Sequence, residues 1–187
     1  MSVYIINTEP EETAVPVDAD EMLIHDASAV ATKKLGLDTL KSYMGTGLVS
    51  ATAATLAITE LAHAGRIIVL NKIDGITVTL PAATGTGARY RFVVGTTVTS
   101  VGYIIKVADA SDLMDGIIYA ADDTGTPAPL VWVAGSTDDT ITLDGSTKGG
   151  IIGDEIELID IASNQWMVRG FVKQSGSEAT PFSATVS

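Results

Sequence analysis

The sequence predicts a mainly β protein, in which the larger C-terminal part is an antiparallel β-sandwich or a barrel-like, jelly-roll-like domain. Three observations support this prediction. From residue 55 onward, apolar residues recur with the period of a strand that has one buried face. Turn signals separate roughly nine or ten short runs of this kind. No segment between them is long enough for a substantial helix, which excludes a βαβ architecture.

The size and composition of the chain agree with this fold class. Its 187 residues fit one or at most two domains and can bury a hydrophobic core. A hydrophobic content of 46% is too high for an intrinsically disordered chain. No apolar run approaches the roughly 18 residues of a membrane span. No Lys- or Arg-led apolar segment opens the sequence, so we expect no signal peptide.

The sequence is expected to form two parts that differ in composition and apolar patterning. These are an N-terminal arm of residues 1–50 with mixed α/β structure and a β-rich domain of residues 51–187. Small, weakly patterned residues at 45–54 are typical of a connector. The arm opens with the apolar, β-forming run Val3–Ile6. Further on, residues 21–26 and 32–35 are predicted to form two strands joined by a turn.

A short helix is predicted at the end of the arm. Asp38 is a suitable N-cap, because its carboxylate can accept a hydrogen bond from an amide of the first turn. Leu37, Leu40 and Met44 keep a near-helical spacing, and Gly45 then ends the helix. A helix of about two turns is far shorter than the roughly 12–15 residues that are stable alone in water. The arm must therefore dock on another surface.

In the β-rich domain, alternation predicts which side chains face the core. Threonine or charged residues occupy many of the intervening positions, as expected for a half-exposed pleated surface. The predicted inward-facing residues are Ile76, Val78, Leu80, Tyr90, Phe92, Val94, Tyr103, Ile105, Val107, Ile141 and Leu143.

Turn signals separate these runs. Asp74-Gly75 lies between residues 66–73 and 76–80 and predicts a two-residue β-hairpin. Ser163-Asn164 separates the predicted strands 155–161 and 165–173. The other signals are a wider loop at residues 82–87 and the dipeptide Asp144-Gly145.

The residue inventory excludes most reaction chemistry. There are 11 Lys and Arg against 23 Asp and Glu, a net charge of -12, which argues against binding to a phosphate backbone. The absence of Cys removes disulfides, thiolate nucleophiles and Cys-ligated zinc. Only His25 and His63 could supply imidazole chemistry. We therefore expect no enzymatic activity, no cofactor and no catalytic or metal site.

Two short motifs match enzyme families only locally. Asn71-Lys72-Ile73-Asp74 matches the guanine-recognising Asn-Lys-x-Asp element of GTPases, but the sequence has no phosphate-binding loop. Asp123-Thr124-Gly125 matches the catalytic triplet of aspartic proteases, yet it lies in polar surroundings instead of between apolar runs. We interpret the first as the end of a hairpin and the second as an exposed turn.

Three other features leave alternatives open. Residues 109–116 contain three carboxylates, which could hold structural calcium or could be solvated loop tips that keep an assembly soluble. Trp132 and Trp166 lie in strand-like runs and are interpreted as core residues, with an exposed sugar-binding platform as the alternative. His63 has no nucleophile motif near it and is interpreted as a hydrogen-bonded loop residue.

Two stretches resemble a known class of proteins. Residues 20–35 read Asp-Glu-Met-Leu-Ile-His-Asp-Ala-Ser-Ala-Val-Ala-Thr-Lys-Lys-Leu, and residues 37–43 read Leu-Asp-Thr-Leu-Lys-Ser-Tyr. This element resembles the strand, Asp-x-Ser turn, Thr-Lys-Lys strand and Leu-rich helical turn of tailed-phage head-decoration, head-fibre and tail-fibre proteins. Residues 76–85 and 90–95 are similar to β-rich domains of phage capsid decoration and other virion structural proteins.

The resemblance implies a homo-oligomer, a trimer, that is made in the cytoplasm of the bacterial host and lies on the outer capsid surface of the virion. The function implied is a capsid decoration (cement) protein that binds the major capsid protein, without nucleic acid or membrane. The alternative is a head- or tail-fibre adhesin that recognises host glycans, with a polysaccharide depolymerase as a third reading. The partner-interface residues expected are Tyr4, Ile5, Ile6, Leu23, Ile24, Lys33, Lys34, Leu37, Leu40 and Tyr43.

Overall fold

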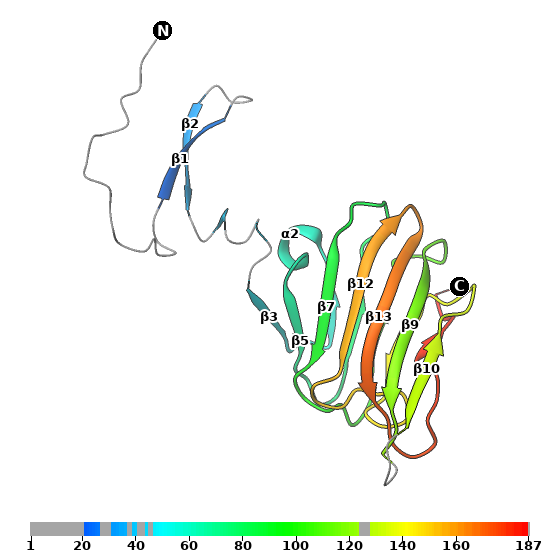
Figure 1. Ribbon diagram of the computed structural model, residues 1–187. Coiled ribbons are helices and arrows are strands. Elements are labelled where there is room, and N and C mark those ends of the chain that lie inside the picture. Colours follow the sequence, from blue (N-terminus) through cyan, green and yellow to red (C-terminus); the bar gives the residue numbers. More distant parts are fainter. Residues whose placement is uncertain are drawn as a thin grey trace. The chain divides into compact units, whose positions relative to one another are not determined.

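The computed structural model describes residues 21–26, 31–36, 39–40, 44, 47–123 and 128–186. The chain forms two compact units, an N-terminal unit of Met1–Tyr43 and a C-terminal unit of Met44–Ser187 (Figure 1). The division therefore falls before residue 44 and not at the expected residue 50. The reason is that β3 (Leu48–Ala51) is hydrogen-bonded to β5 (Ile67–Leu70) and belongs to the C-terminal unit.

The described part of the N-terminal unit contains a two-stranded antiparallel sheet. Strand β1 (Glu21–Asp26) pairs with β2 (Ala31–Gly36). Both strands confirm the sequence prediction, with the second one residue longer at each end. Thr39 and Leu40 are helical, in agreement with the predicted short helix, while its proposed N-cap Asp38 lies outside the described residues.

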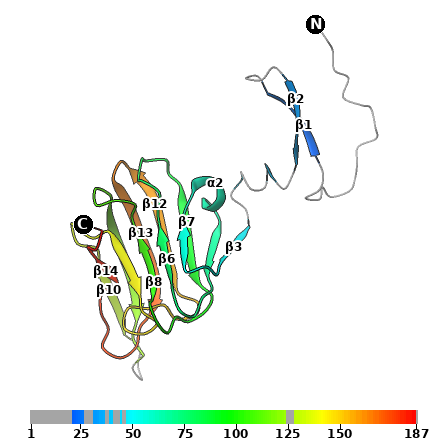
Figure 2. The ribbon, with the colours of Figure 1, turned by 180° about the vertical axis from the view of Figure 1, so that it is seen from behind.

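The C-terminal unit consists of two sheets that pack face to face. The larger sheet has seven strands in the order β10-β9-β13-β12-β7-β5-β3, and the smaller has five in the order β14-β11-β8-β6-β4 (Figures 1 and 2). In the larger sheet the remaining strands are β7 (Arg89–Val94), β9 (Leu113–Ala121), β10 (Pro129–Val133), β12 (Glu155–Ala162) and β13 (Gln165–Lys173). The smaller sheet contains β4 (Thr55–Ala57), β6 (Ile76–Thr79), β8 (Tyr103–Lys106), β11 (Thr140–Leu143) and β14 (Phe182–Ser183). The predicted mainly β, sandwich-like fold is thus confirmed.

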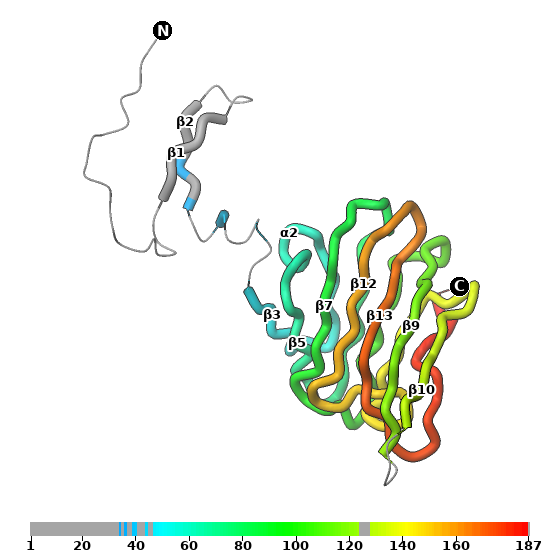
Figure 3. Tube along the Cα trace, viewed as in Figure 1, coloured from blue at the N-terminus to red at the C-terminus, as the bar shows by residue number. Residues whose placement is uncertain are grey.

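The strand pairing differs from the antiparallel arrangement that was expected, because both sheets are mixed. From β3 to β8 the chain places successive strands alternately in the larger and the smaller sheet. Figure 3 shows the strands of the larger sheet side by side along the Cα trace. When the chain returns to a sheet, the new strand lies beside the previous strand of that same sheet and runs in the same direction. Strands β3, β5 and β7 are therefore parallel, as are β4, β6 and β8. Strands β9 and β13 are parallel as well.

The turn at Asp74-Gly75 shows the same difference. It was predicted to join a hairpin, but the strands on either side of it, β5 and β6, belong to different sheets. By contrast, Ser163-Asn164 does join the antiparallel strands β12 and β13, with Asn164 at a φ of 62°. A dipeptide therefore indicated a reversal of the chain in both places, but not whether the two strands pair.

The hydrophobic core lies between the two sheets. All eleven residues predicted to face inward are buried. Trp166 on β13 is 1% exposed, and its ring lies 5.8 Å from that of Tyr90 on β7 in a tilted arrangement. Burial raises the pKa of Tyr90 to about 12, with smaller contributions from Glu60 and Asp160. The one helix of the C-terminal unit whose residues are described, α2 (Glu60–His63), is four residues long.

Candidate functional site

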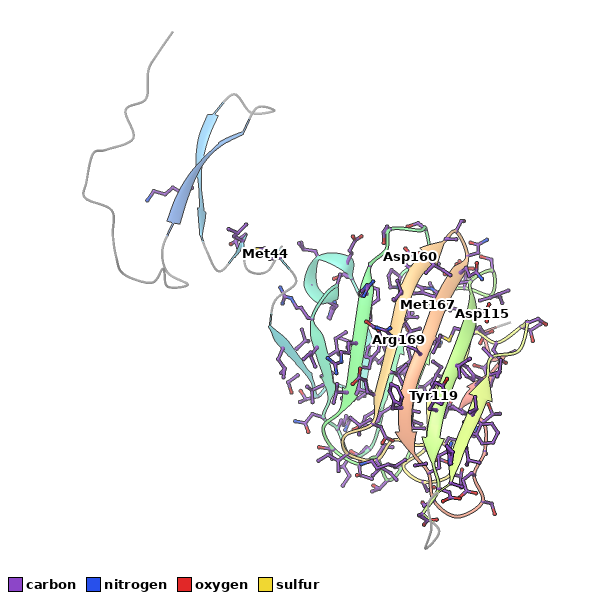
Figure 4. All side chains as sticks on the ribbon, viewed as in Figure 1. Met44, Asp115, Tyr119, Asp160, Met167 and Arg169 are labelled. Carbon is purple, nitrogen blue, oxygen red and sulfur yellow. The ribbon has the colours of Figure 1, made fainter. Side chains whose placement is uncertain are left out.

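The outer face of the seven-stranded sheet, which points away from the smaller sheet, carries the features that stand out for function. Alternation along the strands assigns every second residue to this face. One row of aligned residues runs across all seven strands from Leu48 on β3 to Val133 on β10. Figure 4 shows this face, with Tyr119 on β9 and Arg169 on β13 labelled.

One half of this face is an apolar patch on β13, β9 and β10. Its members are exposed large hydrophobic side chains, namely Ile117 (38%), Tyr119 (48%), Val131 (50%), Val133 (65%) and Phe171 (63%). Their exposed area is on the order of 500 Å², which is in the range of the largest patches on monomeric proteins, and such patches are often functional. The apolar patch is therefore the best candidate for a contact surface.

The patch is continuous because its members are cross-strand neighbours. Phe171 lies opposite Tyr119, which lies opposite Val131. The rings of Tyr119 and Phe171 are stacked, with centroids 5.7 Å apart and planes 16° from parallel. In the adjacent row, Ile117 lies opposite Val133. No charged residue of the sheet lies between these five side chains.

The patch ends at an open sheet edge. Strand β10 is the last of its sheet, and no strand lies beyond it in the part of the chain that the structure describes. Ala134, just after β10, donates its N–H to the carbonyl of Gly116 on β9. Every second residue of β10 counted back from Ala134 therefore also points its backbone N–H and C=O groups towards β9. The backbone groups of Val131 and Val133 point the other way, and an exposed apolar edge of this kind is a template for pairing with another chain.

Towards the centre of the sheet, charged side chains replace the apolar ones. Arg91 on β7 donates two hydrogen bonds to Glu155 on β12, of 2.7 Å from Nε and 2.6 Å from an Nη. Arg169 on β13 forms an ion pair with Glu157 on β12. The hydrogen bond that Arg91 donates to Glu155 raises the pKa of Arg91. Both pairs are solvent-exposed, so each contributes little to the free energy of unfolding.

The expected partner-interface residues all belong to the N-terminal unit. Leu23 and Ile24 lie on β1, opposite Lys34 and Lys33 of β2 respectively. Lys34 is exposed and Leu40 is half-buried. Tyr4, Ile5, Ile6, Leu37 and Tyr43 lie outside the described residues.

Sequence reasoning missed the apolar patch. It had a signal, because Ile117-Ile118-Tyr119 and Leu130–Val133 are apolar at consecutive positions instead of alternating. A strand that is apolar on both faces needs cover on both faces. On the inner face of the sheet Ile118 is buried and Leu130 and Trp132 are half-buried. The apolar residues on the outer face of the same two strands remain exposed to solvent.

Of the two motifs with local matches to enzymes, the structure gives contacts only for the first. In the Asn-Lys-x-Asp segment, Nζ of Lys72 lies 2.9 Å from a carboxylate oxygen of Asp74. Asn71 accepts a hydrogen bond from the hydroxyl of Thr96. Asp123 of the Asp-Thr-Gly triplet is described, while Thr124 and Gly125 lie outside the described residues.

The interpretations of the histidine and the tryptophans are confirmed in part. His63 is hydrogen-bonded as expected, but it is a buried residue of helix α2 and not a loop residue. Nδ1 of His63 lies 3.0 Å from the backbone nitrogen of Thr59, at the start of α2. Trp166 is in the core, and Nε1 of the half-buried Trp132 donates a 3.0 Å hydrogen bond to Oε1 of Gln174. Neither tryptophan forms an exposed platform for a sugar. The exposed aromatic pair is Tyr119 and Phe171 instead.

Several aspartates bind loop backbone amides. Asp160 is 2% exposed and accepts hydrogen bonds from the backbone amides of Thr84, Gly85 and Thr86 at 3.1, 2.7 and 3.0 Å. The hydroxyl of Thr86 donates a further bond of 3.0 Å. Burial would raise the pKa of Asp160, but these hydrogen bonds outweigh burial and lower the pKa below its ordinary value.

Asp139 and Asp144 act in the same way. Asp139 accepts hydrogen bonds from the amides of Thr185 and Val186, and so fastens the C-terminal segment to β11. Asp144 accepts bonds from residues 146–148. In both cases burial opposes ionisation, yet the hydrogen bonds lower the pKa. In Asp154, where burial dominates over similar bonds, the pKa is raised.

The acidic segment 109–116 does not gather its carboxylates at one point. Asp109 bonds to Ser111 within its own loop, Asp112 is buried and accepts the amide of Ala83 at 3.1 Å, and Asp115 lies on the outer face of β9. Within the described ranges no group of three or more His, Cys, Asp or Glu residues is placed to hold a metal ion. The same ranges contain no helix long and apolar enough to cross a membrane.

Comparison with known proteins adds no identification. No protein-family model, no curated protein and no solved structure matches this chain.

Proposed function

We propose that this protein is a non-enzymatic virion structural protein, a capsid decoration protein that binds the major capsid protein and stabilises a phage head. The proposal joins the resemblance of residues 20–43 to phage virion proteins with one observation on the C-terminal unit. That observation is the uncharged apolar patch on the outer sheet face. A patch of this size beside an open strand edge fits a protein whose activity is association.

In this proposal the two units have separate tasks. The N-terminal unit contacts the capsid through Leu23, Ile24, Lys33, Lys34 and Leu40, together with the expected interface residues outside the described part. The apolar patch contacts neighbouring copies of the same chain. Copies that each carry a net charge of -12 repel one another, so a contact between them is most favourable where the surface carries no charge.

Removing residues 1–43 is expected to abolish binding to purified capsids. The remaining unit contains every core residue that the structure describes and keeps β3, so it should fold and melt cooperatively. Co-sedimentation with expanded heads lacking this protein measures binding, and circular dichroism checks the fold. Removing residues 1–50 would not test this prediction, because it also removes most of β3 from the C-terminal unit. A folded truncated protein that still binds capsids would contradict the assignment of capsid binding to the N-terminal unit.

Replacing Val133 with aspartate is expected to weaken self-association by tenfold or more, because the new charge would be buried without a partner in the contact. The matched control is Val101→Asp, since Val101 is 67% exposed against 65% for Val133 and lies outside the patch. Sedimentation equilibrium of the full chain measures the dissociation constant. Equal self-association of the two variants would remove the patch from the proposal.

The second candidate function is a fibre adhesin that recognises glycans, and the exposed, stacked pair Tyr119 and Phe171 favours it. Aromatic rings exposed on a sheet face can pack against the apolar face of a sugar. A glycan array with the full chain and with Phe171→Ala separates the two functions. Saccharide binding that is lost in the variant supports the adhesin, whereas binding to heads without saccharide binding supports decoration.

A further inference from the structure

All four arginines of the chain lie in one region of the C-terminal unit. Arg89 and Arg91 are on β7, Arg169 is on β13, and Arg66 immediately precedes β5. The three β-strand arginines occupy outward positions of the seven-stranded sheet, and Arg169 is labelled there in Figure 4. This concentration of guanidinium groups is unexpected in a protein with a net charge of -12.

Three of these arginines surround a surface pocket. The pocket has a volume of about 310 Å³ and is lined by Gly65, Arg66, Ile67, Arg89, Arg91 and Glu157. It lies where β5 and β7 run side by side, with Ile67 directly opposite Arg91. The site is on the same sheet face as the apolar patch, but on different strands.

The ion pairs of this face leave one arginine uncompensated. Arg91 is paired with Glu155, and Arg169 with Glu157. Arg89 is exposed and has neither an ion pair nor a side-chain hydrogen bond with any described residue. Its neighbour on β12 is Ile159, which is apolar and 8% exposed, so that strand supplies no carboxylate opposite it.

We propose that this arginine pocket binds a carboxylate side chain of an acidic polypeptide, with Arg89 as the principal ligand. The planar guanidinium fork matches a carboxylate in two-point geometry, and the adjacent Arg91–Glu155 pair is an example on the same strand. On this face Glu155 neutralises Arg91 and Glu157 neutralises Arg169. The charge left over is that of Arg89, which one carboxylate neutralises, whereas a phosphate dianion carries more negative charge than Arg89 balances.

The inference does not depend on the decoration role. It concerns the end of the sheet formed by β5 and β7, while the proposed function uses the N-terminal unit and the apolar patch. A chain that fails to bind capsids could still bind an acidic peptide, and the reverse also holds. The two proposals are therefore tested by separate measurements.

The test follows the side-chain NMR signals of the arginines, which can each be observed because the chain has only four. In the full, ¹⁵N-labelled chain the arginine Nε–Hε region contains four signals, which substitution of single arginines assigns. The probe is a glutamate-rich decapeptide, with a glutamine-rich decapeptide and inorganic phosphate as comparison ligands. We expect the Arg89 signal to shift saturably with the glutamate-rich peptide alone.

Two variants provide the control. Arg89→Gln removes the principal ligand, and Lys106→Gln removes one positive charge from β8 of the other sheet. We expect Arg89→Gln to weaken binding of the glutamate-rich peptide by about tenfold or more, since it removes charge-assisted hydrogen bonds, and Lys106→Gln to leave it unchanged. An equal dissociation constant in both variants, or no saturable shift at all, would overturn the site. Equal or tighter binding of phosphate would overturn its assignment to carboxylates.

Discussion

Replacing Gly116 with alanine is expected to unfold the C-terminal unit or to lower its free energy of unfolding by about 4 kcal/mol or more. Gly116 lies within β9, opposite Val168 of β13, and has a φ of 149°. A Cβ at this position would lie 1.8 Å from the carbonyl oxygen of Val168, which is backbone and cannot move without breaking the β9–β13 pairing. The substitution therefore separates the two strands that carry most of the apolar patch.

The matched control for this prediction is Gly87→Ala. Gly87 also has a positive φ, of 75°, but a Cβ there would meet no atom within 4 Å. The control should lose only the conformational cost, about 1–2 kcal/mol. Urea unfolding followed by circular dichroism gives both values. A loss in Gly116→Ala no greater than that in Gly87→Ala would show that β9 and β13 are not paired as described.

Replacing Asp160 with asparagine is expected to lower the free energy of unfolding by about 2–4 kcal/mol at neutral pH. The buried carboxylate accepts hydrogen bonds from three backbone amides and one hydroxyl of residues 84–86. An asparagine places an NH₂ group, which can only donate, against some of these donors. Asp74→Asn is the control, because the exposed carboxylate of Asp74 bonds to no described residue other than Lys72, and it should change stability by less than about 0.5 kcal/mol.

The effect of Asp160 should also depend on pH. Its pKa is lower in the folded protein than the ordinary value of about 3.9 for the unfolded chain. The ionised carboxylate thus stabilises the protein above that value, and the stabilisation is lost as the pH falls through the folded pKa. The difference in stability between the wild-type chain and Asp160→Asn should accordingly shrink below about pH 4. A difference that stays constant down to pH 2 would contradict ionisation of Asp160 in the folded protein.

The inward-facing residues could be predicted from the sequence because burial is a local property of a strand. Tyr90, Phe92 and Val94 alternate with Arg89 and Arg91, and one buried face follows directly from that alternation. The strands 21–26 and 165–173 were predicted with the bounds that the structure gives them. In each case the information lies within a few consecutive residues.

The pairing of the strands could not be predicted in the same way. Whether the chain turns back at Asp74-Gly75 or crosses to the other sheet depends on where β3 and β7 lie, and the dipeptide does not contain that information. The arginine pocket has the same origin, because Arg66 and Arg89 are distant in sequence and meet only through the parallel pairing of β5 and β7. For the apolar patch, the sequence shows the consecutive apolar residues but not which strand ends the sheet.

The parallel pairing of β9 with β13 has a consequence for the order of folding. In the first part of the C-terminal unit, paired strands are close in sequence, as with Leu48 opposite Ile67, whereas Leu113 lies opposite Gln165. Contacts between residues so far apart form slowly, because the intervening chain must first be closed into a loop. We therefore expect β13 to join β9 late during folding. Phe171 of β13 would then reach Tyr119 only in a fully folded chain, and immature chains would lack the stacked aromatic pair of the patch.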